Sequence, residues 1–426
     1  MNILIIGNGG REHALAWKIA QSPRVSHIYV APGNAGTALE NKVSNVNINA
    51  DQIDALIKFA KDNHVALTIV GPEAPLVIGI VDSFANAGLR CFGPSKLAAR
   101  LEGSKAFSKD FLKRHHIPTA GYNTFTPTTL DESWIRAQRA PLVVKADGLA
   151  AGKGVIICAT QDEAVQTVKD MFAGKFGAAG NTVVVEEFLE GEEASFIVMV
   201  DGTHVLPFAT SQDHKRLLDK DEGPNTGGMG AYSPAPVVTP DIHQRVMREI
   251  IEPTVRGMIA DGTPYVGFLY AGLMIDSSGA PKVIEFNCRF GDPEAQPVMT
   301  RLKSDLTVLC EAALDGKLNQ VTAEWIPQAA IGVVLAAENY PETPRKGDVI
   351  SGLDVAAKLP GKVFHAGTTL NGNDVVTNGG RVLCAVGTGN TVKAAQQQAY
   401  ALADVIKWQG VQYRRDIGYR AIARES

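Results

Sequence analysis

The sequence predicts an α/β protein. A doubly wound, parallel-sheet domain comes first, a central region follows, and a small α/β domain ends the chain. Three observations support this prediction. Short apolar strands alternate with helical stretches over the first hundred residues; a strand, a glycine-rich loop and a second strand occupy residues 141–157; and two apolar strands flank a tight turn within residues 268–286. Strands that alternate with helices are typical of parallel sheets, whereas strands joined by tight turns pair antiparallel.

Composition narrows the class of protein. Hydrophobic residues make up 45% and charged residues 20% of the 426, the balance of an ordinary globular protein with several domains. A net charge of −4 provides no basic surface for nucleic acid or an anionic membrane, so neither is an expected partner. The five scattered cysteines form no Cys-x-x-Cys pair, which favours reduced thiols over disulfides or zinc. No basic leader and no apolar run of ~18 residues occurs, so we expect a cytoplasmic protein.

The first domain is predicted from its alternating elements. The expected strands are 2–7, 27–31, 66–71 and 90–93, and the expected helices are 11–21, 51–63, 75–87 and 95–101. Each strand ends at a Gly or Pro turn, and the carboxyl ends of parallel strands lie on one rim, where open α/β sheets bind ligands.

The first turn of this domain invites a dinucleotide-binding interpretation, but the motif is incomplete. Gly7 and Gly9 fit it, whereas Glu12 occupies the third glycine position and the second strand ends without an acid for a ribose hydroxyl. A loop that approaches phosphate or ribose at a helix N-terminus is the better prediction. By position alone, Arg11 would be a solvated residue of the first helical turn.

The strand–loop–strand unit of the central region has the features of a phosphate-binding loop. Gly148, Gly152 and Gly154 let backbone N–H groups approach anionic oxygens, and Lys145 and Lys153 add positive charge. A mobile hairpin with incidental lysines is the alternative. The unit is not a Walker A loop, because GxxxxGK[ST] is absent and strands flank the loop.

A metal site is predicted on the second strand of the hairpin. Side chains alternate along a strand, so Glu285 and Asn287 share one face and Phe286 takes the other. A carboxylate beside an amide oxygen suits Mg²⁺, and Arg289 directly after them indicates recognition of carboxylate or phosphate. The partner strand provides no further acid, and Asp276 lies too near the turn to replace one.

Two other regions are predicted less specifically. The polar segment 210–236 is expected to lack regular structure, and a loop of this length in a compact domain usually has a function or is disordered. In the last hundred residues we expect strands at 333–337, 362–365 and 381–385 and helices at 304–315 and 391–406. Arg381 could be structural or could reach the nucleotide.

Several of these motifs resemble those of known enzymes. The strand Glu-Phe-Asn and the strand–lysine–glycine loop–strand unit resemble ATP-grasp ligases. The runs Arg-Phe-Gly-Asp-Pro-Glu and Gly-Asn-Gly-Gly-Arg-Glu-His are similar to those of the phosphoribosylamine–glycine ligase family. The resemblance extends from residue 2 to about 420. It implies ATP-grasp central domains and boundaries at residues 1–102, 103–327 and 328–426, with a small clamp subdomain at about 123–192.

The resemblance also assigns roles to individual residues. Metal binding falls to Glu285 and Asn287. ATP binding falls to Lys105, Lys145, Gly148, Gly152, Lys153, Gly154, Glu187, Leu189, Glu193 and Asn225. Substrate binding falls to Gly9, Gly10, Arg11, Glu73, Asp213, Arg289 and Gly291, and catalysis to Arg289, Lys215 and Asp213.

The implied reaction is ATP-dependent ligation of glycine to 5-phosphoribosylamine with Mg²⁺ or Mn²⁺, catalysed by a monomer. No Ser-His-Asp or Cys-His constellation is found, as expected where alignment and charge neutralisation dominate. Two alternatives stay open: an ATP-grasp carboxylate–amine ligase for another acid, and a non-catalytic nucleotide-binding protein. A nicotinamide oxidoreductase ranks last because its motif is incomplete.

Overall fold

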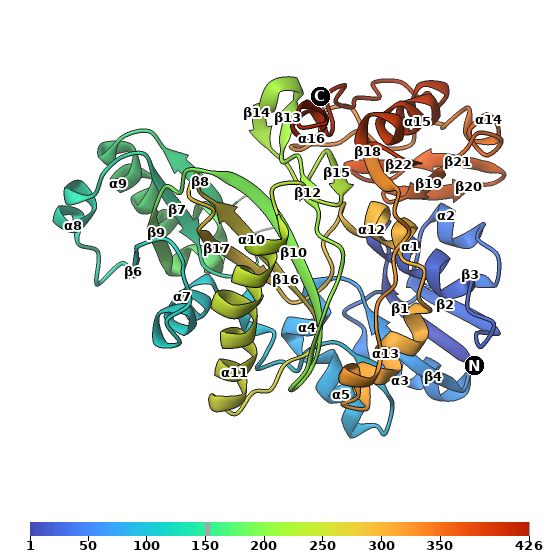
Figure 1. Ribbon diagram of the computed structural model, residues 1–426, viewed down its shortest axis with the longest axis horizontal. Helices are drawn as coiled ribbons and strands as arrows, with labels where there is room; N and C mark the ends of the chain where they lie inside the picture. The colour runs from blue at the N-terminus through green and yellow to red at the C-terminus, as the bar shows by residue number, and fades with distance from the viewer. Residues whose placement is uncertain (150–153, 426) are drawn as a thin grey trace.

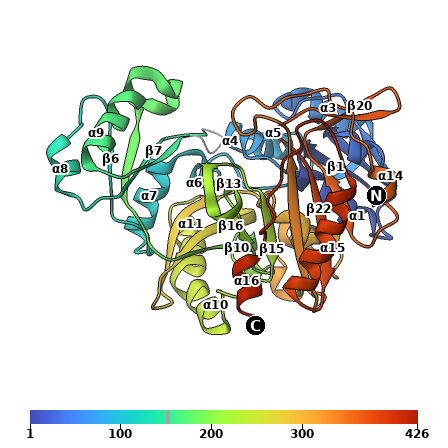
Figure 2. The same cartoon turned by 90° about the horizontal axis from the view of Figure 1, so that it is seen from above.

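The computed structural model describes residues 1–149 and 154–425, and they form three groups of elements around a central sheet (Figure 1). The N-terminal elements and the C-terminal elements lie together on one side of that sheet. A small lobe containing α8 (Glu132–Ala137) and α9 (Gln161–Asp170) projects on the other side. Seen from above, this lobe is again set apart from the rest of the molecule (Figure 2).

The N-terminal domain is the predicted doubly wound sheet. Its five parallel strands have the order β3-β2-β1-β4-β5, so their carboxyl ends share one rim, as expected. The strands are β1 (Asn2–Gly7), β2 (His27–Pro32), β3 (Val43–Asn45), β4 (Val65–Val70) and β5 (Cys91–Phe92), and the helices are α1 (Gly10–Ala20), α2 (Ala35–Ala38), α3 (Ile53–Asp62), α4 (Glu73–Ile78) and α5 (Ile80–Asn86).

Two predicted helices of this region differ from the structure. The helix expected at 75–87 is divided at Gly79, whose φ of 99° lies in the left-handed region that ends helices. The helix expected at 95–101 is wrong at its start, because α6 is only Arg100–Gly103. Pro94 and Ser95 precede it in an irregular turn.

The projecting lobe, here called the clamp, is a four-stranded antiparallel sheet of order β6-β9-β7-β8. Its strands are β6 (Tyr122–Phe125), β7 (Leu142–Ala146), β8 (Val155–Cys158) and β9 (Val183–Glu187). Thr160 and Glu163 form a capping box at the start of α9, and a π-helix (Met171–Lys175) and a 3-10 helix (Gly177–Asn181) follow. The helix α7 (Lys105–Arg114) leads into the clamp, and Ser104 caps it by accepting from the Phe107 N–H at 3.1 Å.

The central sheet has the order β11-β10-β16-β17, and its last two strands are the predicted hairpin. The strands are β10 (Glu192–Asp201), β11 (Val205–Pro207), β16 (Val266–Ile275) and β17 (Pro281–Asn287). The helices that accompany it are α10 (Pro240–Val246), a π-helix (Met247–Ile251), α11 (Glu252–Ala260), α12 (Ala295–Arg301), α13 (Leu306–Leu314) and a 3-10 turn (Leu318–Gln320).

The C-terminal domain contributes most of a third sheet, of order β12-β15-β18-β22-β19. Its own elements are β18 (Ala329–Ala336), α14 (Leu353–Ala356), β19 (Lys362–His365), the hairpin β20 (Thr368–Asn371) with β21 (Asp374–Thr377), β22 (Arg381–Gly389), α15 (Val392–Val405) and α16 (Tyr419–Ala423). The other two strands, β12 (Gln212–Asp213) and β15 (Gly230–Ser233), come from the polar segment.

The prediction that residues 210–236 lack regular structure is therefore wrong. Between β12 and β15 the segment also forms a two-stranded unit, β13 (Arg216–Leu218) with β14 (Glu222–Asn225), around a 3-10 turn (Asp219–Asp221). Because β15 pairs with β18, the segment is built into the sheet of the C-terminal domain.

Among the clusters of buried apolar side chains, one is shared by all three domains and a separate, smaller one lies in the clamp. One cluster joins Ile5 of the first sheet, Val298 of α12 and Val386 of β22, so it spans all three domains. The clamp has a separate small core, which includes Val144, Val168 and Val185. All five cysteines are buried and free, as expected. Among the described residues, none of the helices has the length and hydropathy needed to cross a membrane.

Buried histidines join the first and last domains. His13 Nδ1 accepts the His365 backbone N–H at 2.8 Å, so His13 Nε2 carries the proton and donates to Glu40 at 3.2 Å. Lys362 also pairs with Glu40, at 2.6 Å. Burial lowers the pKa of His13, and burial with the nearby His13 and Lys362 lowers the pKa of His365 to about 3. Both rings are therefore neutral at pH 7.

Candidate active site

The pleat of β17 separates its side chains as predicted. Phe286 is 2% exposed and packs in the core, whereas Glu285 and Asn287 are half-buried on the opposite face. Across the hairpin, Gly272 pairs with Glu285. A Cβ at position 272 would lie only 3.3 Å from Glu285 Cγ. The absence of a side chain at Gly272 therefore leaves room for the side chain of Glu285.

Four cationic side chains act on Glu285. Burial alone would raise the pKa of its carboxyl group, but Lys215, Lys145, Lys105 and Arg289 together hold that pKa below its usual range. They come from four different segments of the chain: the polar segment, β7, α7 and the run after β17. Such convergence of positive charge around a carboxylate and an amide is the composition expected of a site for a polyphosphate with a divalent cation.

The lysines of the clamp are held by a buried acid. Glu186 forms ion pairs with Lys145 Nζ at 2.9 Å and with Lys109 Nζ at 2.8 Å. Lys109 is 3% exposed, so α7 buries this lysine beside Glu186. Sequence reasoning missed Glu186, although side-chain alternation along β9 required one of Glu186 and Glu187 to face inward.

The described part of the glycine-rich loop is tied to the start of α7. Lys105 Nζ donates to the Gly148 carbonyl at 2.8 Å, and Asp147 accepts from Ser104 Oγ at 3.2 Å. At the other end of the loop the Gly154 carbonyl accepts the Ala146 N–H at 2.8 Å. Gly152 and Lys153, predicted to bind phosphate, lie outside the described residues.

Arg289 is held between two acids. Its Nε lies 3.3 Å from Glu73 and its second terminal nitrogen 3.1 Å from Glu102. Burial opposes the charge of Arg289, but Glu102 and Glu73 raise its pKa. Glu102 also accepts the Cys288 backbone N–H at 2.7 Å, and burial raises the pKa of Glu102. Glu102 was missed because nothing in its neighbourhood along the chain links it to a residue 187 positions later.

The first turn of the N-terminal domain meets the run after β17. Arg11 donates to the Phe290 carbonyl at 3.2 Å and is 6% exposed, so the prediction of a solvated helical turn is wrong. A Cβ at Gly9 would lie 3.1 Å from Asp292 Oδ2, and one at Gly10 would lie 2.3 Å from the Gln296 amide nitrogen. A Cβ at Gly291 would lie 2.4 Å from Glu294. The predicted substrate residues of the two domains are thus in direct proximity.

Asp213 and Lys215, both predicted to act in catalysis, lie in a cluster of charged side chains with Glu193. Lys215 Nζ lies 2.8 Å from Glu193 Oε2. Despite burial, Glu193, Asp213 and Glu285 raise the pKa of Lys215 well above its usual value. Burial, opposed by Lys215 and reinforced by Glu294, raises the pKa of Asp213 to about 8. A lysine that stays charged beside a carboxyl that ionises near neutrality can bind a zwitterion.

The remaining predicted residues lie farther out. Glu187 is exposed at the end of β9, where its N–H donates to the Gly121 carbonyl at 2.9 Å and its carboxylate lies 3.5 Å from Lys282. Leu189 lies in the connection from β9 to β10, and Asn225 is exposed in β14 opposite Arg216.

The donor set at the end of β17 fits a hard divalent cation only in part. In the described ranges, no group of three His, Cys, Asp or Glu side chains forms a metal site. Asp276 binds its own turn, accepting the Ser278 and Ala280 N–H groups at 2.8 and 3.0 Å. Glu285 and Asn287 therefore provide one carboxylate and one amide, which suits Mg²⁺ if phosphate oxygens and water supply the other ligands.

Comparison with known proteins identifies the family. Three models of phosphoribosylglycinamide synthetase match consecutive parts of the chain: the N domain over residues 1–102, the ATP-grasp (A) domain over 103–295 and the C domain over 330–420. The chain belongs to the phosphoribosylglycinamide synthetase family. ATP-grasp members of this kind use ATP, and the N-terminal, ATP-grasp and C-terminal architecture agrees with the predicted fold class.

Individual relatives agree over the full length. The phosphoribosylamine–glycine ligase of Vibrio cholerae is 68% identical over 426 residues, which is 100% of this chain and 99% of the relative. That of Pseudomonas aeruginosa is 65% identical over the same length. The crystal structure of the Thermotoga maritima ligase is 34% identical, with a TM-score of 0.85, covering 98% of this chain and 100% of that one. The biotin carboxylase domain of Hydrogenobacter thermophilus 2-oxoglutarate carboxylase shares only the fold, at 15% identity and a TM-score of 0.73.

Proposed function

We propose that this chain is a phosphoribosylamine–glycine ligase of purine biosynthesis that binds ATP between the clamp and β17. The observation that carries the proposal is the convergence of Lys215, Lys145, Lys105 and Arg289 on Glu285. The proposed substrates are 5-phosphoribosylamine, glycine and ATP.

The proposed reaction has two steps. A glycine carboxylate oxygen attacks the γ-phosphorus of ATP, the bond to the β-phosphate oxygen breaks, and glycyl phosphate and ADP result. The 1-amine of phosphoribosylamine then attacks the glycyl carbonyl carbon, the bond to phosphate breaks, and the amine loses a proton as the amide forms. Both steps depend on alignment and on stabilising negative charge, and neither requires a protein nucleophile.

The nucleotide is assigned to the clamp side. Lys105 and Lys145 neutralise its phosphates, and Gly148, Gly152, Lys153 and Gly154 of the glycine-rich loop are assigned to the same phosphates. Glu187 and Leu189 flank adenine, Glu193 holds the ribose, and Asn225 contacts phosphate. Glu285 and Asn287 would hold Mg²⁺ or Mn²⁺, which when bound would neutralise phosphate charge.

The acceptor and the amino acid are assigned to the domain junction. Asp213 and Lys215 receive the ammonium and carboxylate of glycine, in line with the acidic and basic character of these two adjacent side chains. Arg289, held by Glu73 and Glu102, faces the transferred phosphoryl group. Gly9, Gly10 and Arg11 from the first domain, with Glu73 and Gly291, surround phosphoribosylamine.

We also propose domain boundaries and an oligomeric state. We assign residues 1–102, 103–327 and 328–426 to three domains, with the clamp at about 123–192, in a cytoplasmic monomer. Sedimentation of the purified chain would measure its mass against the 45.3 kDa of one copy, and a dimer would contradict the last point.

The test is a coupled assay in which phosphoribosylamine is generated in situ. Phosphate release is expected to require ATP, glycine and phosphoribosylamine together, and alanine in place of glycine should give little. Equal ATP consumption with both acceptors omitted would contradict the proposal. Turnover only with another amino acid would favour a different carboxylate–amine ligase, and ATP binding without phosphate release would indicate a non-catalytic nucleotide-binding protein.

A further inference from the structure

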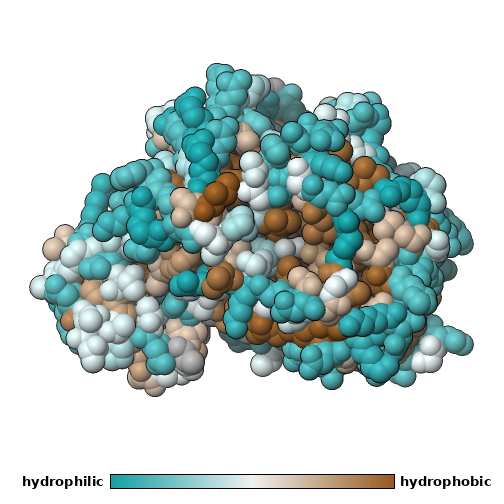
Figure 3. Space-filling view, turned by 90° about the horizontal axis from the view of Figure 1, so that it is seen from below, coloured by the Kyte–Doolittle hydropathy of each residue, from teal (hydrophilic) through white to brown (hydrophobic). Residues whose placement is uncertain are grey.

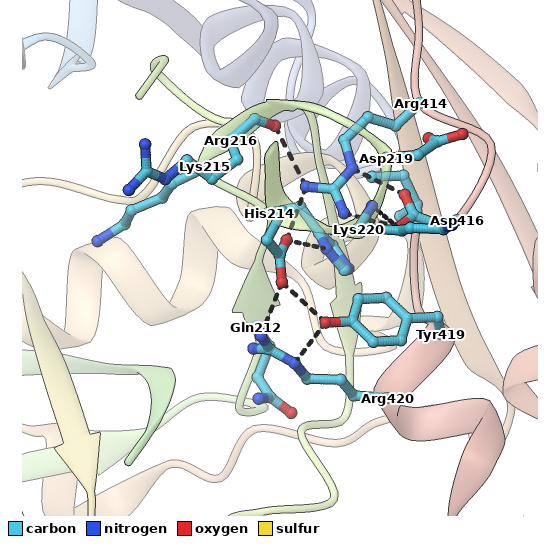
Figure 4. Close-up of polar contacts among 12 residues, drawn as sticks. Gln212, His214, Lys215, Arg216, Asp219, Lys220, Arg414, Asp416, Tyr419 and Arg420 are labelled. Carbon is cyan, nitrogen blue, oxygen red and sulfur yellow. Dashed lines mark hydrogen bonds and ion pairs between the residues drawn. The ribbon is translucent and has the colours of Figure 1, made fainter. Parts of the chain in front are cut away.

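The segment that carries Asp213 and Lys215 is held in place by the end of the chain. Figure 4 shows Arg216, Asp219 and Lys220 of this segment close to Arg414, Asp416, Tyr419 and Arg420, with polar contacts between the two groups. These four residues, here called the C-terminal clasp, are nearly two hundred positions from the segment they contact.

Asp221 is the main point of attachment. Its Oδ1 accepts from Arg414 at 2.9 Å, and its Oδ2 accepts from the Tyr419 hydroxyl at 2.8 Å and from Arg420 at 2.7 Å. Arg414, whose side chain is fully buried, also donates to the Arg216 carbonyl at 3.2 Å. The carboxylate of Asp221 thus accepts hydrogen bonds from three side chains of the clasp. These three contacts restrict the position of Asp221 far more than a single surface ion pair would.

Hydrogen bonds from backbone N–H groups extend the attachment to the two residues before Asp221. Asp416 accepts the Lys220 N–H at 2.8 Å, and Asp219 accepts the Arg415 N–H at 2.7 Å. Lys220 and Asp221 both have positive φ, 60° and 57°. Two consecutive non-glycine residues in the left-handed region are costly and persist only where surrounding contacts impose them. The clasp supplies those contacts.

His214 transmits the attachment to the site. It lies between Asp213 and Lys215, and its Nε2 accepts the Gly418 N–H at 2.9 Å. Its Nδ1 therefore carries the proton and points toward Asp221, 3.9 Å away. Gly418 is the residue directly before Tyr419, so the clasp contacts the side chain of the residue that separates Asp213 from Lys215.

The far end of the segment is fixed by the same domain. The Gly227 N–H donates to the Tyr340 hydroxyl at 2.9 Å, and Arg381 donates to the Gly227 and Asp292 carbonyls at 2.6 Å each. Arg381 therefore braces two segments of the site and has a structural part in it. The loop is anchored at two places by a domain that provides neither Asp213 nor Lys215.

We propose that Arg414, Tyr419 and Arg420 are positioning residues for the amino-acid half of the reaction, acting through Asp221 on Asp213 and Lys215. The proposal rests on the proposed function of those two residues. It makes the C-terminal domain part of the machinery that selects and orients the amino acid, through a contact outside the substrate site itself.

The test compares Asp221→Asn and Arg420→Gln with Arg415→Gln. The Arg415 side chain pairs with Asp404 and Tyr413 inside the C-terminal domain, so Arg415→Gln is a control of the same type five positions from Arg420. The side chain of Arg420 is 44% exposed, so its loss leaves no buried gap. Asp221→Asn and Arg420→Gln are expected to lower kcat/KM for glycine about tenfold or more, with KM for ATP within about twofold of wild type.

Three further measurements separate positioning from a general loss of structure. Arg420→Lys should recover most of the loss, because it keeps one charged donor for Asp221. The double variant with Asp221→Asn should lose less than the two single losses combined. Wild-type glycine kinetics in both Asp221→Asn and Arg420→Gln, with Lys215→Met inactive, would overturn the proposal. An active Lys215→Met would instead overturn the assignment of Lys215, and equal losses for ATP and glycine would indicate a merely structural contact.

Discussion

The clamp and the domain junction are attached to the central sheet in different ways. The junction shares one apolar core with the sheet, because side chains of the first, central and last domains pack together in it. The clamp has its own core, and the space-filling view shows it as a lobe separated from the body by a notch (Figure 3). The proposed amino-acid and sugar sites are therefore built into a continuous body, whereas the proposed nucleotide grip is carried by a lobe that we expect to open and close.

Polar contacts take the place of a shared core at the clamp. Lys145 donates to the Ile284 carbonyl at 3.3 Å, and Lys105 contacts Gly148 across the same gap. These are the lysines assigned to the phosphates. In this proposal, nucleotide binding and attachment of the clamp depend on the same side chains, whereas the junction is also held by its shared apolar core.

The largest expected loss of turnover comes from substituting Glu285, which lies between the clamp and the domain junction. Glu285→Gln removes the charge that four cations surround, and it should lower turnover at least about 100-fold while the fold is kept. The coupled assay and a circular dichroism spectrum measure the two properties. Glu190→Gln, at an exposed position, serves as control and should stay active. A fully active Glu285→Gln would remove this residue from the site.

A smaller effect, confined to the nucleotide, is expected from the clamp. Lys145→Met should lower kcat/KM for ATP about tenfold or more and increase amide exchange within residues 122–187, because it breaks the contacts to Glu186 and Ile284. Lys169→Met, which removes only an ion pair with Glu132 on the clamp surface, is the matched control. Unchanged exchange in Lys145→Met would mean that the clamp is held by something else.

An effect of similar size, on the junction side, is expected from Glu102. Glu102→Gln loosens Arg289 without touching substrate, so kcat should fall about tenfold while KM for ATP changes little. Glu324→Gln, which breaks an exposed pair with Lys303, provides the comparison. If kcat is unaffected, Glu73 alone is sufficient to orient Arg289.

The smallest expected effect is on stability in acid. His13 and His365 are neutral when folded and bind protons when unfolded, so their contribution is complete above pH 6.5 and is lost as the pH falls below it. Each should lower the free energy of unfolding by about 1.4 kcal/mol per pH unit while only the unfolded state is protonated. His365→Gln should flatten this dependence. As the pH falls, amide exchange should increase at the junction at a higher pH than in the clamp. An increase in the clamp first would mean that the clamp, and not the junction, is the region that acid destabilises.

Whether a contact could be predicted from the sequence depends on how far apart its two residues lie along the chain. The faces of β17 followed from alternation between neighbouring residues, and the parallel first sheet followed from local apolar runs and turns. Glu102 and Glu186 could not be assigned, because their partners Arg289 and Lys145 come from other segments. The polar segment was expected to be irregular for the same reason: its partners at 414–420 and in β18 lie far ahead in the chain.

The clasp also has a consequence for biosynthesis. Residues 414–420 are translated nearly two hundred residues after the turn at Lys220 and Asp221, and until then that turn lacks their contacts. The clamp, the central hairpin and the first sheet are translated earlier and can fold sooner. A nascent or nicked chain that stops before residue 414 would therefore lack the contacts that hold this turn, so the proposed amino-acid site would be completed after the proposed nucleotide site.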